Sequence, residues 1–463
     1  MESSRQAIVI GGSMAGLWTA RVLADHFAQV TIVERDLLPL GPQSRTGVPQ
    51  DKHVHILLAR GSEIMQQLFP GVVEELLAAG AIHVNLSRDS RTKMRGQWLQ
   101  RFTGRNETYA CSRILLEATL RQRVRALPQV QFCEGAQVVG LLAEGDRVTG
   151  VRVHQSGQAN AAELSADFVV DASGRTSKTP TWLTELGYGA PEETVINAHV
   201  GYAGRRYRKP AGIAEDWHIM LVGAQPPTQS RQGLIYEEEH GVWMVMLAGI
   251  MQDYPPTQEA EFLTFAQSVE PALYEAIRQA EPLTEIFGYR HTENRFRHYE
   301  KLARWPERFV VTGDAACAFN PIYGQGMTTA AVMALALGDL LRQSQGLDGV
   351  ARRFQQQIPK IVEPAWLLAT GADIEWIGRP ARQPLTSRVS QWYLSQLLDT
   401  MPVDREVHEA FSAVQHLMQP PVTLFRPPIA RRVLAHWWRA RRQRRNLAVQ
   451  QRGATVLREV ESK

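Results

Sequence analysis

The sequence predicts an α/β protein in which a parallel-sheet unit is interleaved with an antiparallel sheet and followed by helices. Two glycine-bearing turns, within residues 7–16 and 310–327, each follow a short apolar run that is typical of a buried parallel strand. Residues 195–250 show hairpin-like patterns with a Glu-His-Gly turn, which indicates an antiparallel sheet. Beyond residue 328 the pattern is helical, with prolines that predict breaks.

The first glycine turn has the pattern of a dinucleotide-binding βαβ unit. A predicted strand at 7–10 leads into the turn at 11–16, and a helix and a second strand at 30–33 follow, ending at Glu34. The glycines allow close backbone approach to a pyrophosphate, the helix N-terminus offers free N–H groups, and Glu34 is placed to accept ribose hydroxyls. Ser13 replaces the middle glycine of G-x-G-x-x-G, and its hydroxyl can donate to a phosphate oxygen. A turn without a ligand is the alternative, which the complete strand-helix-strand context disfavours.

The second glycine segment points to the same ligand. A predicted strand at 309–311 leads into Gly313-Asp314, and Gly324 and Gly326 precede a helix that starts near Met327. Either segment alone is a weak signal. Together, in this order, they predict one flavin held at its pyrophosphate by the first segment and at its ring by the second.

Local patterns predict the remaining elements and a division into domains. The expected helices are 53–69, 71–83, 111–126 and 258–279, and the expected strands are 93–109, 135–142, 148–154, 168–171, 217–223, 234–238 and 242–248. Helix breaks are expected at Pro359, Pro364, Pro380, Pro384, Pro402 and Pro420-Pro421. These elements predict a flavin-binding domain (1–86, 110–185 and 301–345), a substrate domain (87–109 and 186–300) and a helical C-terminal region with a basic tail (346–463).

Composition narrows the class of protein. The chain has 463 residues and 44% hydrophobic content, enough for more than one sizeable core. Its three cysteines form no C-x-x-C pair, so neither a metal site nor a disulfide framework is predicted, which suits a cytoplasmic protein. No apolar run approaches the roughly 18–20 residues of a membrane-spanning helix, and no cleavable signal pattern is expected.

The net charge of +4 conceals an uneven distribution. Residues 426–463 hold 11 Lys or Arg and 2 Asp or Glu, a balance of +9, which leaves −5 for the rest of the chain. The densest part, Arg439–Arg445, follows Trp437 and Trp438. One interpretation is an amphipathic helix, peripheral to the membrane, in weak contact with anionic lipid or an acidic partner. The interpretation we favour is a solvated helix with its tryptophans packed on the body. No recognised nucleic-acid-binding module accompanies the tail, so no nucleic-acid partner is predicted.

With these motifs placed, the chain resembles the single-component FAD-dependent monooxygenases of the aromatic-hydroxylase (group A) type. The residues that carry the resemblance are Gly11–Gly16, Glu34, Arg113, Asp171-Ala172-Ser173-Gly174 and Gly313-Asp314. Four further segments look like the bacterial flavin epoxidases that act on polyene polyketides in polyether antibiotic biosynthesis: 47–57, 68–71, 111–113 and 318–327. The resemblance implies a Rossmann-like FAD-binding domain with an interleaved antiparallel-sheet substrate domain and C-terminal helices.

The resemblance also implies which residues hold the cofactor. Asp314 would bind the ribityl hydroxyls, Arg113 would reach the ribityl chain or pyrophosphate, and Arg45 would be the flavin-side arginine. The helix at Met327 would direct its N-terminus to N1/O2 of the flavin. The backbone of Val138 would face adenine. The complete set of predicted FAD-binding residues is Gly11, Ser13, Ala15, Gly16, Glu34, Arg35, Arg45, Arg113, Val138, Asp314, Gly324, Gly326 and Met327. Arg45 and Arg113 could instead be ordinary ion-pair residues.

The implied function is an FAD-dependent monooxygenase with NADPH or NADH as a transient co-substrate. A flavin hydroperoxide would epoxidise or hydroxylate an apolar small molecule: a polyene, polyketide or terpenoid. No catalytic side chain is assigned, because this chemistry belongs to the cofactor. One alternative is a reductase of the geranylgeranyl-reductase type, and another is a non-enzymatic flavin-carrying binding protein. A halogenase is disfavoured because the Trp-x-Trp-x-Ile-Pro signature is absent.

Several side chains are candidates for the substrate side, each with a structural alternative. Trp217, Ile219, Leu221, Trp243, Val245 and Leu247 alternate along predicted strands and would line one apolar wall or form ordinary core. His53 and His55 would face the flavin or form a polar loop pair. Tyr323 would face the substrate or pack in the core. Cys317 is expected to have no redox role, and Met244 and Met246 are expected in the core.

Overall fold

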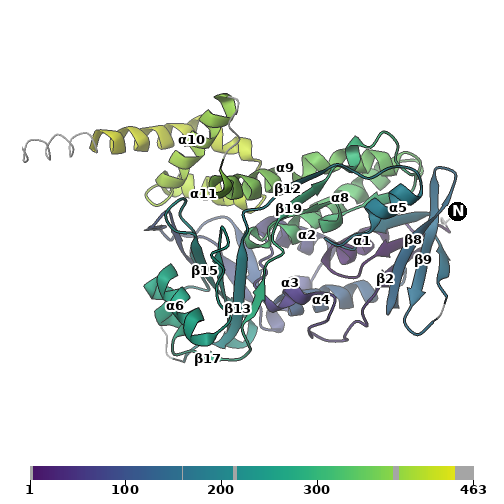
Figure 1. The fold of residues 1–463 in the computed structure, drawn as a ribbon, viewed down its shortest axis with the longest axis horizontal. Helices are drawn as coiled ribbons and strands as arrows, with labels where there is room; N and C mark the ends of the chain where they lie inside the picture. The colour runs from purple at the N-terminus through teal and green to yellow at the C-terminus, as the bar shows by residue number, and fades with distance from the viewer. Residues whose placement is uncertain (1–3, 159, 212–215, 379–384, 444–463) are drawn as a thin grey trace, which may run out of the picture.

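The computed structural model describes residues 4–158, 160–211, 216–378 and 385–443 (Figure 1). A five-stranded parallel sheet with the order β20-β11-β1-β2-β7 forms the centre of the nucleotide-binding unit. Its strands are β1 (Gln6–Ile10), β2 (Gln29–Glu34), β7 (Val130–Glu134), β11 (Phe168–Asp171) and β20 (Phe309–Val311). Their near-continuous burial is that of a parallel sheet covered on both faces. The predicted fold class is confirmed.

Helices surround this sheet, and a second small sheet contacts its strands β2 and β11. The helices are α1 (Met14–Leu23), α2 (Ala59–Leu68), α3 (Val72–Ala78), α4 (Arg113–Arg125), α5 (Thr179–Glu185) and α8 (Gly326–Gln343), and the small sheet contains β8 (Ala136–Glu144), β9 (Arg147–Gln155) and β10 (Ala162–Ser165). α1 packs directly on α8, where a Cβ on Gly338 would lie 2.5 Å from Val22. The two glycine-bearing turns are therefore brought together by neighbouring helices.

The second unit is an eight-stranded, mainly antiparallel sheet, seen at the left of Figure 1. It contains β4 (Ser90–Met94), β5 (Gln97–Trp98), β13 (Gly201–Arg208), β14 (Ile219–Val222), β15 (Arg231–Glu238), β16 (Val242–Gly249), β17 (Glu281–Pro282) and β18 (Phe287–Tyr289). Smaller sheets contain β12 (Glu193–Ile196), β19 (Asn294–Arg297) and β21 (Cys317–Ala318), and β3 (Ile82–Asn85) with β6 (Glu107–Ala110). Segments from both ends of the chain thus interleave.

The prediction that the alternating side chains of this sheet line one apolar wall is wrong, because they lie in two separate clusters. Trp243 stacks on Trp217 at 5.5 Å and packs with Val245 and Leu247 in a core against α6 (Glu259–Val269) and α7 (Pro271–Ile277). Ile219 and Leu221 belong to a different cluster, together with Tyr202. Trp217 lies before β14, so the period-two pattern does not continue from it into the strand. The stripe is structural core, and Met244 and Met246 are buried as expected.

Prolines account for two further differences from the sequence-based expectation. The predicted helix at 258–279 is two helices, because Glu270 before Pro271 is extended, with φ −163° and ψ 125°. In contrast, α9 (Val350–Ile377) continues through Pro359 and Pro364. A helix-interior proline costs about 3 kcal/mol, and burial of the α9 face that packs on α8 offsets that cost.

The C-terminal region is a small helical unit with its own core. It contains α10 (Leu385–Thr400), α11 (Arg405–Gln415) and a helix over residues 427–443 that extends away from the body (Figure 1). Leu397, Val407, Leu424 and Val433 are buried together there. Within the described part of the chain, no helix combines the length and apolar character needed to cross a membrane.

Candidate cofactor and substrate site

Two adjoining cavities lie where the parallel sheet meets the antiparallel sheet. The larger has a volume of about 610 Å³ and the smaller about 330 Å³. Both are lined by Ser13, Arg35, Gly47 and Ala172, so they meet at the first glycine turn. An elongated two-part space of this kind suits a dinucleotide whose halves extend to either side of its pyrophosphate.

Glycines of the first turn allow close backbone packing at the junction. Gly11 has φ +100°, and a Cβ there would lie 2.8 Å from the Ala172 carbonyl oxygen. A Cβ on Gly16 would lie 1.8 Å from the Gly11 carbonyl oxygen, so the helix can start this close only with glycine. Ser13 precedes α1 without a side-chain capping bond, and Ala15 in the first turn lines the larger cavity. The positive end of α1 therefore faces the junction.

Glu34 stands at the smaller cavity and already makes two backbone contacts. Its Oε2 accepts a 2.7 Å hydrogen bond from the Gly12 N–H, and its Oε1 accepts one of 3.0 Å from Asp36. Oε2 also lies 3.3 Å from the Arg45 guanidinium, whereas Oε1 keeps a further acceptor site, so ribose binding remains compatible with these bonds. Arg35 and Val138 line the same cavity, as expected for its adenosine end. Glu34 thus also shapes the glycine turn itself.

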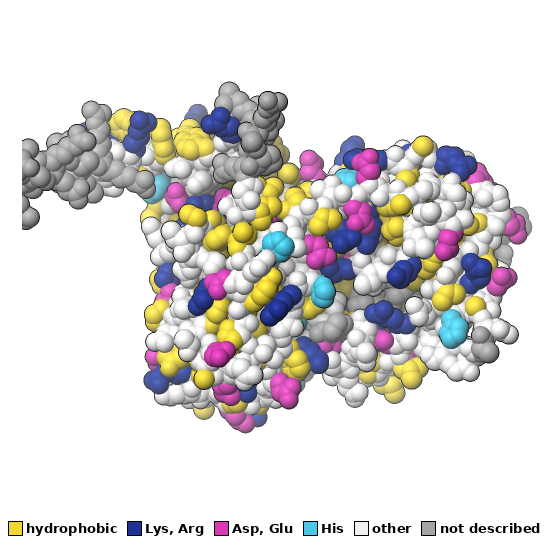
Figure 2. Space-filling model, in the orientation of Figure 1, with side chains coloured by type: hydrophobic (Ala, Val, Ile, Leu, Met, Phe, Trp, Pro, Cys, Tyr) yellow, Lys and Arg dark blue, Asp and Glu magenta, His cyan; other side chains and the backbone are white. Residues whose placement is uncertain are grey.

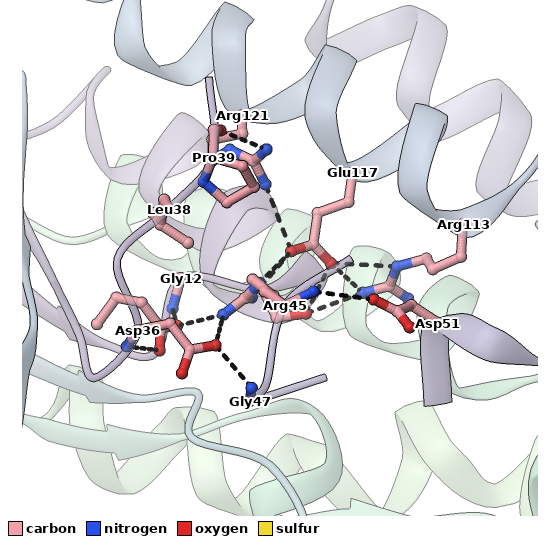
Figure 3. A network of polar contacts seen from close by, with 12 residues as sticks. Gly12, Asp36, Leu38, Pro39, Arg45, Gly47, Asp51, Arg113, Glu117 and Arg121 are labelled. Atoms are coloured by element: carbon pink, nitrogen blue, oxygen red, sulfur yellow. Dashed lines mark hydrogen bonds and ion pairs between the residues drawn. The ribbon is translucent and has the colours of Figure 1, made fainter. Parts of the chain in front are cut away.

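The main residue that sequence reasoning missed is Glu117 on α4. Its carboxylate pairs with Arg113 at 2.6 Å and with Arg45 at 2.9 Å, and Arg121 lies 3.7 Å away (Figure 3). It also accepts a 3.0 Å hydrogen bond from the Ser13 hydroxyl. Burial alone would raise its pKa, but Arg113 and Arg45 outweigh burial and lower it to about 2. The i, i+4 spacing of Arg113, Glu117 and Arg121 was the signal available in the sequence.

The Glu117 network places the two predicted arginines at different ends of the site. Arg113 donates a 2.8 Å hydrogen bond to the Ser13 hydroxyl and lines the larger cavity. Arg45 lies at the smaller cavity and also pairs with Asp36 at 2.8 Å and Glu34 at 3.3 Å. The structure therefore does not bring Arg45 to the cavity expected for the flavin ring. Its side chain is 6% exposed, so it is not an ordinary surface ion-pair residue.

The second glycine segment forms one wall of the larger cavity. Asp314, Gly324, Gly326 and Met327 all line it, and α8 begins at Gly326. Across the described residues, no hydrogen bond or ion pair engages the Asp314 carboxylate. Burial raises its pKa, and nearby arginines oppose that shift. A partly buried carboxylate without a protein partner fits hydroxyl donors of a bound ribityl chain.

The far wall of the larger cavity, formed by Tyr202, Tyr289 and His55, is aromatic. Tyr202 stacks on Tyr289 at 5.3 Å, and His55 lies beside them in the lining. Burial lowers the pKa of His55 to about 3, with Arg113 adding to the effect. His53 is buried behind this wall, edge-on to Tyr202 at 4.8 Å, and burial lowers its pKa to about 4. Of the two histidines, the structure brings only His55 to the cavity.

Tyr323 does not line either cavity but anchors the segment that does. Its hydroxyl donates a 2.7 Å hydrogen bond to Asp373, a fully buried residue of α9. The Asn294 side-chain amide donates to the same carboxylate at 2.6 Å. The backbone N–H of Asn320 in turn donates to Oδ1 of Asn294 at 2.8 Å. Cys317 is buried nearby, and burial raises the pKa of its thiol well above the usual range. These contacts make Tyr323 and Asp373 structural supports of the cavity wall.

Comparison with known proteins identifies the nucleotide. Residues 4–351 match the model of the FAD binding domain family. The chain is 32% identical over 465 residues to Protein Rv3254 of Mycobacterium tuberculosis, covering 95% of this chain and 96% of that one. It is 29% identical over 178 residues to squalene monooxygenase of Mus musculus, covering 37% of this chain and 29% of that one.

The fold is also that of known flavoproteins. The flavin-dependent brominase Bmp2 superposes with a TM-score of 0.65 at 13% identity, covering 95% of this chain and 100% of that one. The glycine cradle, the unpartnered Asp314 carboxylate and the adjoining cavities all fit FAD. The chain therefore belongs to the FAD binding domain family and is a flavoprotein oxidoreductase of the monooxygenase type, with FAD as its cofactor.

Proposed function

We propose that this protein uses NADPH or NADH and O₂ to epoxidise or hydroxylate an apolar small molecule, such as a polyene, polyketide or terpenoid. The observation that carries the proposal is the far wall of the larger cavity. Tyr202 and Tyr289 form it, Ile56 and Phe319 also line the cavity, and His55 is uncharged at neutral pH. Such a lining favours an apolar substrate next to the flavin ring.

The chain's own residues have binding, orienting and shielding tasks in this reaction. Reduced FAD supplies, on reaction with O₂, an oxygen atom that electron-rich double bonds accept. Arg113 and the N-terminus of α1 hold the pyrophosphate, and Asp314 holds the ribityl chain. The start of α8 at Gly326 directs a positive helix end toward the ring. The aromatic wall excludes water from the reacting atoms.

Two considerations favour an alkene over a phenol as the acceptor. The name of the mouse relative specifies squalene, a hydrocarbon alkene, and monooxygenation. A phenol hydroxylase gains from a nearby base that takes the phenolic proton. Here the wall histidine has a pKa of about 3, lowered by burial, which makes it a weak base. The likeness to the brominase is one of fold, at 13% identity.

The test is turnover of an alkene panel beside a phenol panel under ¹⁸O₂ with NADPH or NADH. We expect one labelled oxygen atom in an epoxide or allylic alcohol. At limiting FAD, an Asp314→Ala variant should form much less labelled product, whereas the matched exposed variant Asp339→Ala should retain activity. Label in phenolic products alone would identify an aromatic hydroxylase. Reduced product without label would identify a reductase, and absence of NADPH or NADH consumption with every substrate would indicate a binding protein.

A further inference from the structure

Exposed apolar side chains are concentrated in the C-terminal helical unit. Sixteen large hydrophobic residues are exposed in the described part of the chain, and seven of them lie within residues 385–443. This segment is a small part of the protein, so the enrichment is local. Trp438 is 60% exposed and Leu434 is 43% exposed. Exposed groups of this kind, gathered in one unit, indicate a binding surface.

Four of these side chains, together with the half-buried Trp437, form what we call the tryptophan patch: Val389, Trp392, Leu434, Trp437 and Trp438. The Trp392 ring of α10 meets the Trp437 ring of the terminal helix edge-on at 5.5 Å, which joins the two helices. Of the two neighbouring tryptophans, only Trp437 therefore packs on α10. Leu434 and Trp438 are one helical turn apart and share a face.

Arginines continue the same helix face toward the C-terminus. The guanidinium of Arg441 lies 5.4 Å from the ring centre of Trp437, and that of Arg442 lies 5.9 Å from Trp438. As far as the structure describes the chain, neither arginine pairs with an acidic side chain. Figure 2 shows hydrophobic and basic side chains side by side on the part of this helix that extends from the body, at the upper left. The surface is thus apolar and cationic at once.

Charge decides which occupant suits this surface. Residues 426–463 carry +9, while the rest of the chain carries −5. A second copy docking patch to patch would bring two cationic segments together, which is unfavourable. An anionic lipid surface attracts the terminal segment and repels the body, so it also orients the molecule. Tryptophan and arginine side chains favour the headgroup level of a bilayer.

We propose that the tryptophan patch and its flanking arginines bind the surface of anionic membranes, with the terminal helix lying in the interface. Trp438 and Leu434 insert into the headgroup region, and Arg439, Arg441 and Arg442 contact lipid phosphates. This binding is peripheral and reversible, because its electrostatic part is screened by salt. It is independent of the reaction that the flavin site carries out.

The test is sedimentation of the full-length holoprotein with vesicles. Vesicles of equal parts phosphatidylcholine and phosphatidylglycerol should retain the protein at low salt and release it at high salt. Vesicles of phosphatidylcholine alone should bind it far less. Each arginine near such a surface contributes about 5-fold in affinity. The triple variant Arg439→Gln, Arg441→Gln and Arg442→Gln should therefore bind about 100-fold more weakly.

Apolar variants separate insertion from simple charge attraction. The double variant Leu434→Ser with Trp438→Ser should lose binding, whereas Leu40→Ser, at a body residue that is 84% exposed, should bind like the wild type. FAD content, measured by absorbance, should be unchanged in every variant. Absence of binding to anionic vesicles at low salt would overturn the proposal. Unchanged vesicle binding by the Leu434→Ser, Trp438→Ser variant would also overturn it. The same holds if the wild type self-associates and this variant does not.

Discussion

Tyr323 donates a 2.7 Å hydrogen bond from its hydroxyl to Oδ1 of Asp373. This bond connects residues 318–327, which contribute to the lining of the larger cavity, to α9. Fifty residues separate the two partners in the chain. Asn294 and Asn320 direct their side-chain amides to the same carboxylate. The segment that lines the larger cavity is therefore held from behind by a buried polar cluster. Because buried polar groups are costly when unpaired, the cluster fixes one position of that segment.

We expect Tyr323→Phe to weaken FAD binding without contacting FAD. The variant leaves one Asp373 oxygen short of its strongest donor, at a cost of about 1–3 kcal/mol in the free energy of unfolding. The loosened segment should lower FAD affinity as well, which fluorescence titration of the apoprotein measures. Tyr109→Phe serves as a control, because this partly exposed tyrosine lies in β6, away from both cavities. Equal FAD affinity in Tyr323→Phe and the wild type would contradict the positioning role.

Asp373 should give the stability of the protein a particular pH dependence. Burial raises its pKa to about 6 from the ordinary 3.8, against the hydrogen bonds from Tyr323, Asn320 and Asn294. The folded state then binds the proton more tightly than the unfolded state does. Its contribution to stability is therefore full below about pH 4 and declines as pH rises to about 6, by about 3 kcal/mol.

Urea unfolding of the wild type and Asp373→Asn across this pH range measures that contribution. The difference between the two free energies of unfolding should change by about 3 kcal/mol between pH 4 and pH 6. The exposed variant Asp339→Asn should show no such trend. A constant difference between wild type and Asp373→Asn would show that the carboxyl does not titrate there.

Glu117→Gln should be strongly destabilising, because Glu117 neutralises a buried cluster of arginines. Arg113 and Arg45 both contact it within 3 Å, and their side chains are each 6% exposed. Removing one partner of such a buried arrangement costs about 3–5 kcal/mol. Glu75→Gln is the matched control, since it removes an exposed pair with Arg123 at 2.9 Å and should cost at most about 1 kcal/mol. Similar unfolding free energies for the two variants would contradict this role.

The low pKa of Glu117 predicts the opposite pH trend from that of Asp373. Burial alone would raise this pKa, but the two arginines lower it from 4.5 to about 2. The folded state therefore binds the proton less tightly, so the stabilisation is present above about pH 4.5 and is lost as pH falls through 2. Acid unfolding followed by circular dichroism should show a shallower transition in Glu117→Gln than in the wild type. A transition of equal steepness would mean that Glu117 is not ionised in the folded protein.

The sequence predicted the parts of the site that lie on the backbone. Glycine turns after buried strands specify where the chain approaches a dinucleotide, so Gly11 and Gly324 are accessible to local reasoning. The polar side chains that support the site come from distant elements. Asp373 lies in a helix that the prolines had predicted to be broken, and nothing local marks it. Glu117 could have been found from its i, i+4 arginines, although their convergence with Arg45 depends on tertiary structure.

The alternation of side chains along a strand also does not show which face of the sheet meets the site. Trp243 and its neighbours along β16 face α6 and α7, whereas Tyr202 on β13 reaches the cavity. Both faces of this sheet are buried, so hydrophobicity alone does not separate them. The distinction requires knowing which side the flavin unit covers. The tail shows the same limit: local sequence gives two adjacent tryptophans, and only packing against Trp392 distinguishes Trp437 from Trp438.

The predicted roles of the FAD-binding residues are tested by Asp314→Ala. The Asp314 carboxylate faces the larger cavity without a protein partner among the described residues, so its removal breaks no internal bond. Loss of its charge-assisted hydrogen bonds should weaken FAD binding by about 1.5–3 kcal/mol, with stability of the apoprotein unchanged. Acid precipitation of the wild type should release all flavin as FAD, since no covalent attachment motif is present.

Glu34→Ala provides a contrast that separates cofactor binding from support of the fold. It removes a ribose acceptor and also the bonds to the backbone of Gly12 and Asp36. We therefore expect Glu34→Ala to lower both FAD affinity and apoprotein stability, and Asp314→Ala to lower affinity alone. Titration of each apoprotein with FAD, beside its urea unfolding curve, measures the two quantities separately. Unchanged FAD affinity in both variants would refute the assignment of the two glycine segments to one flavin.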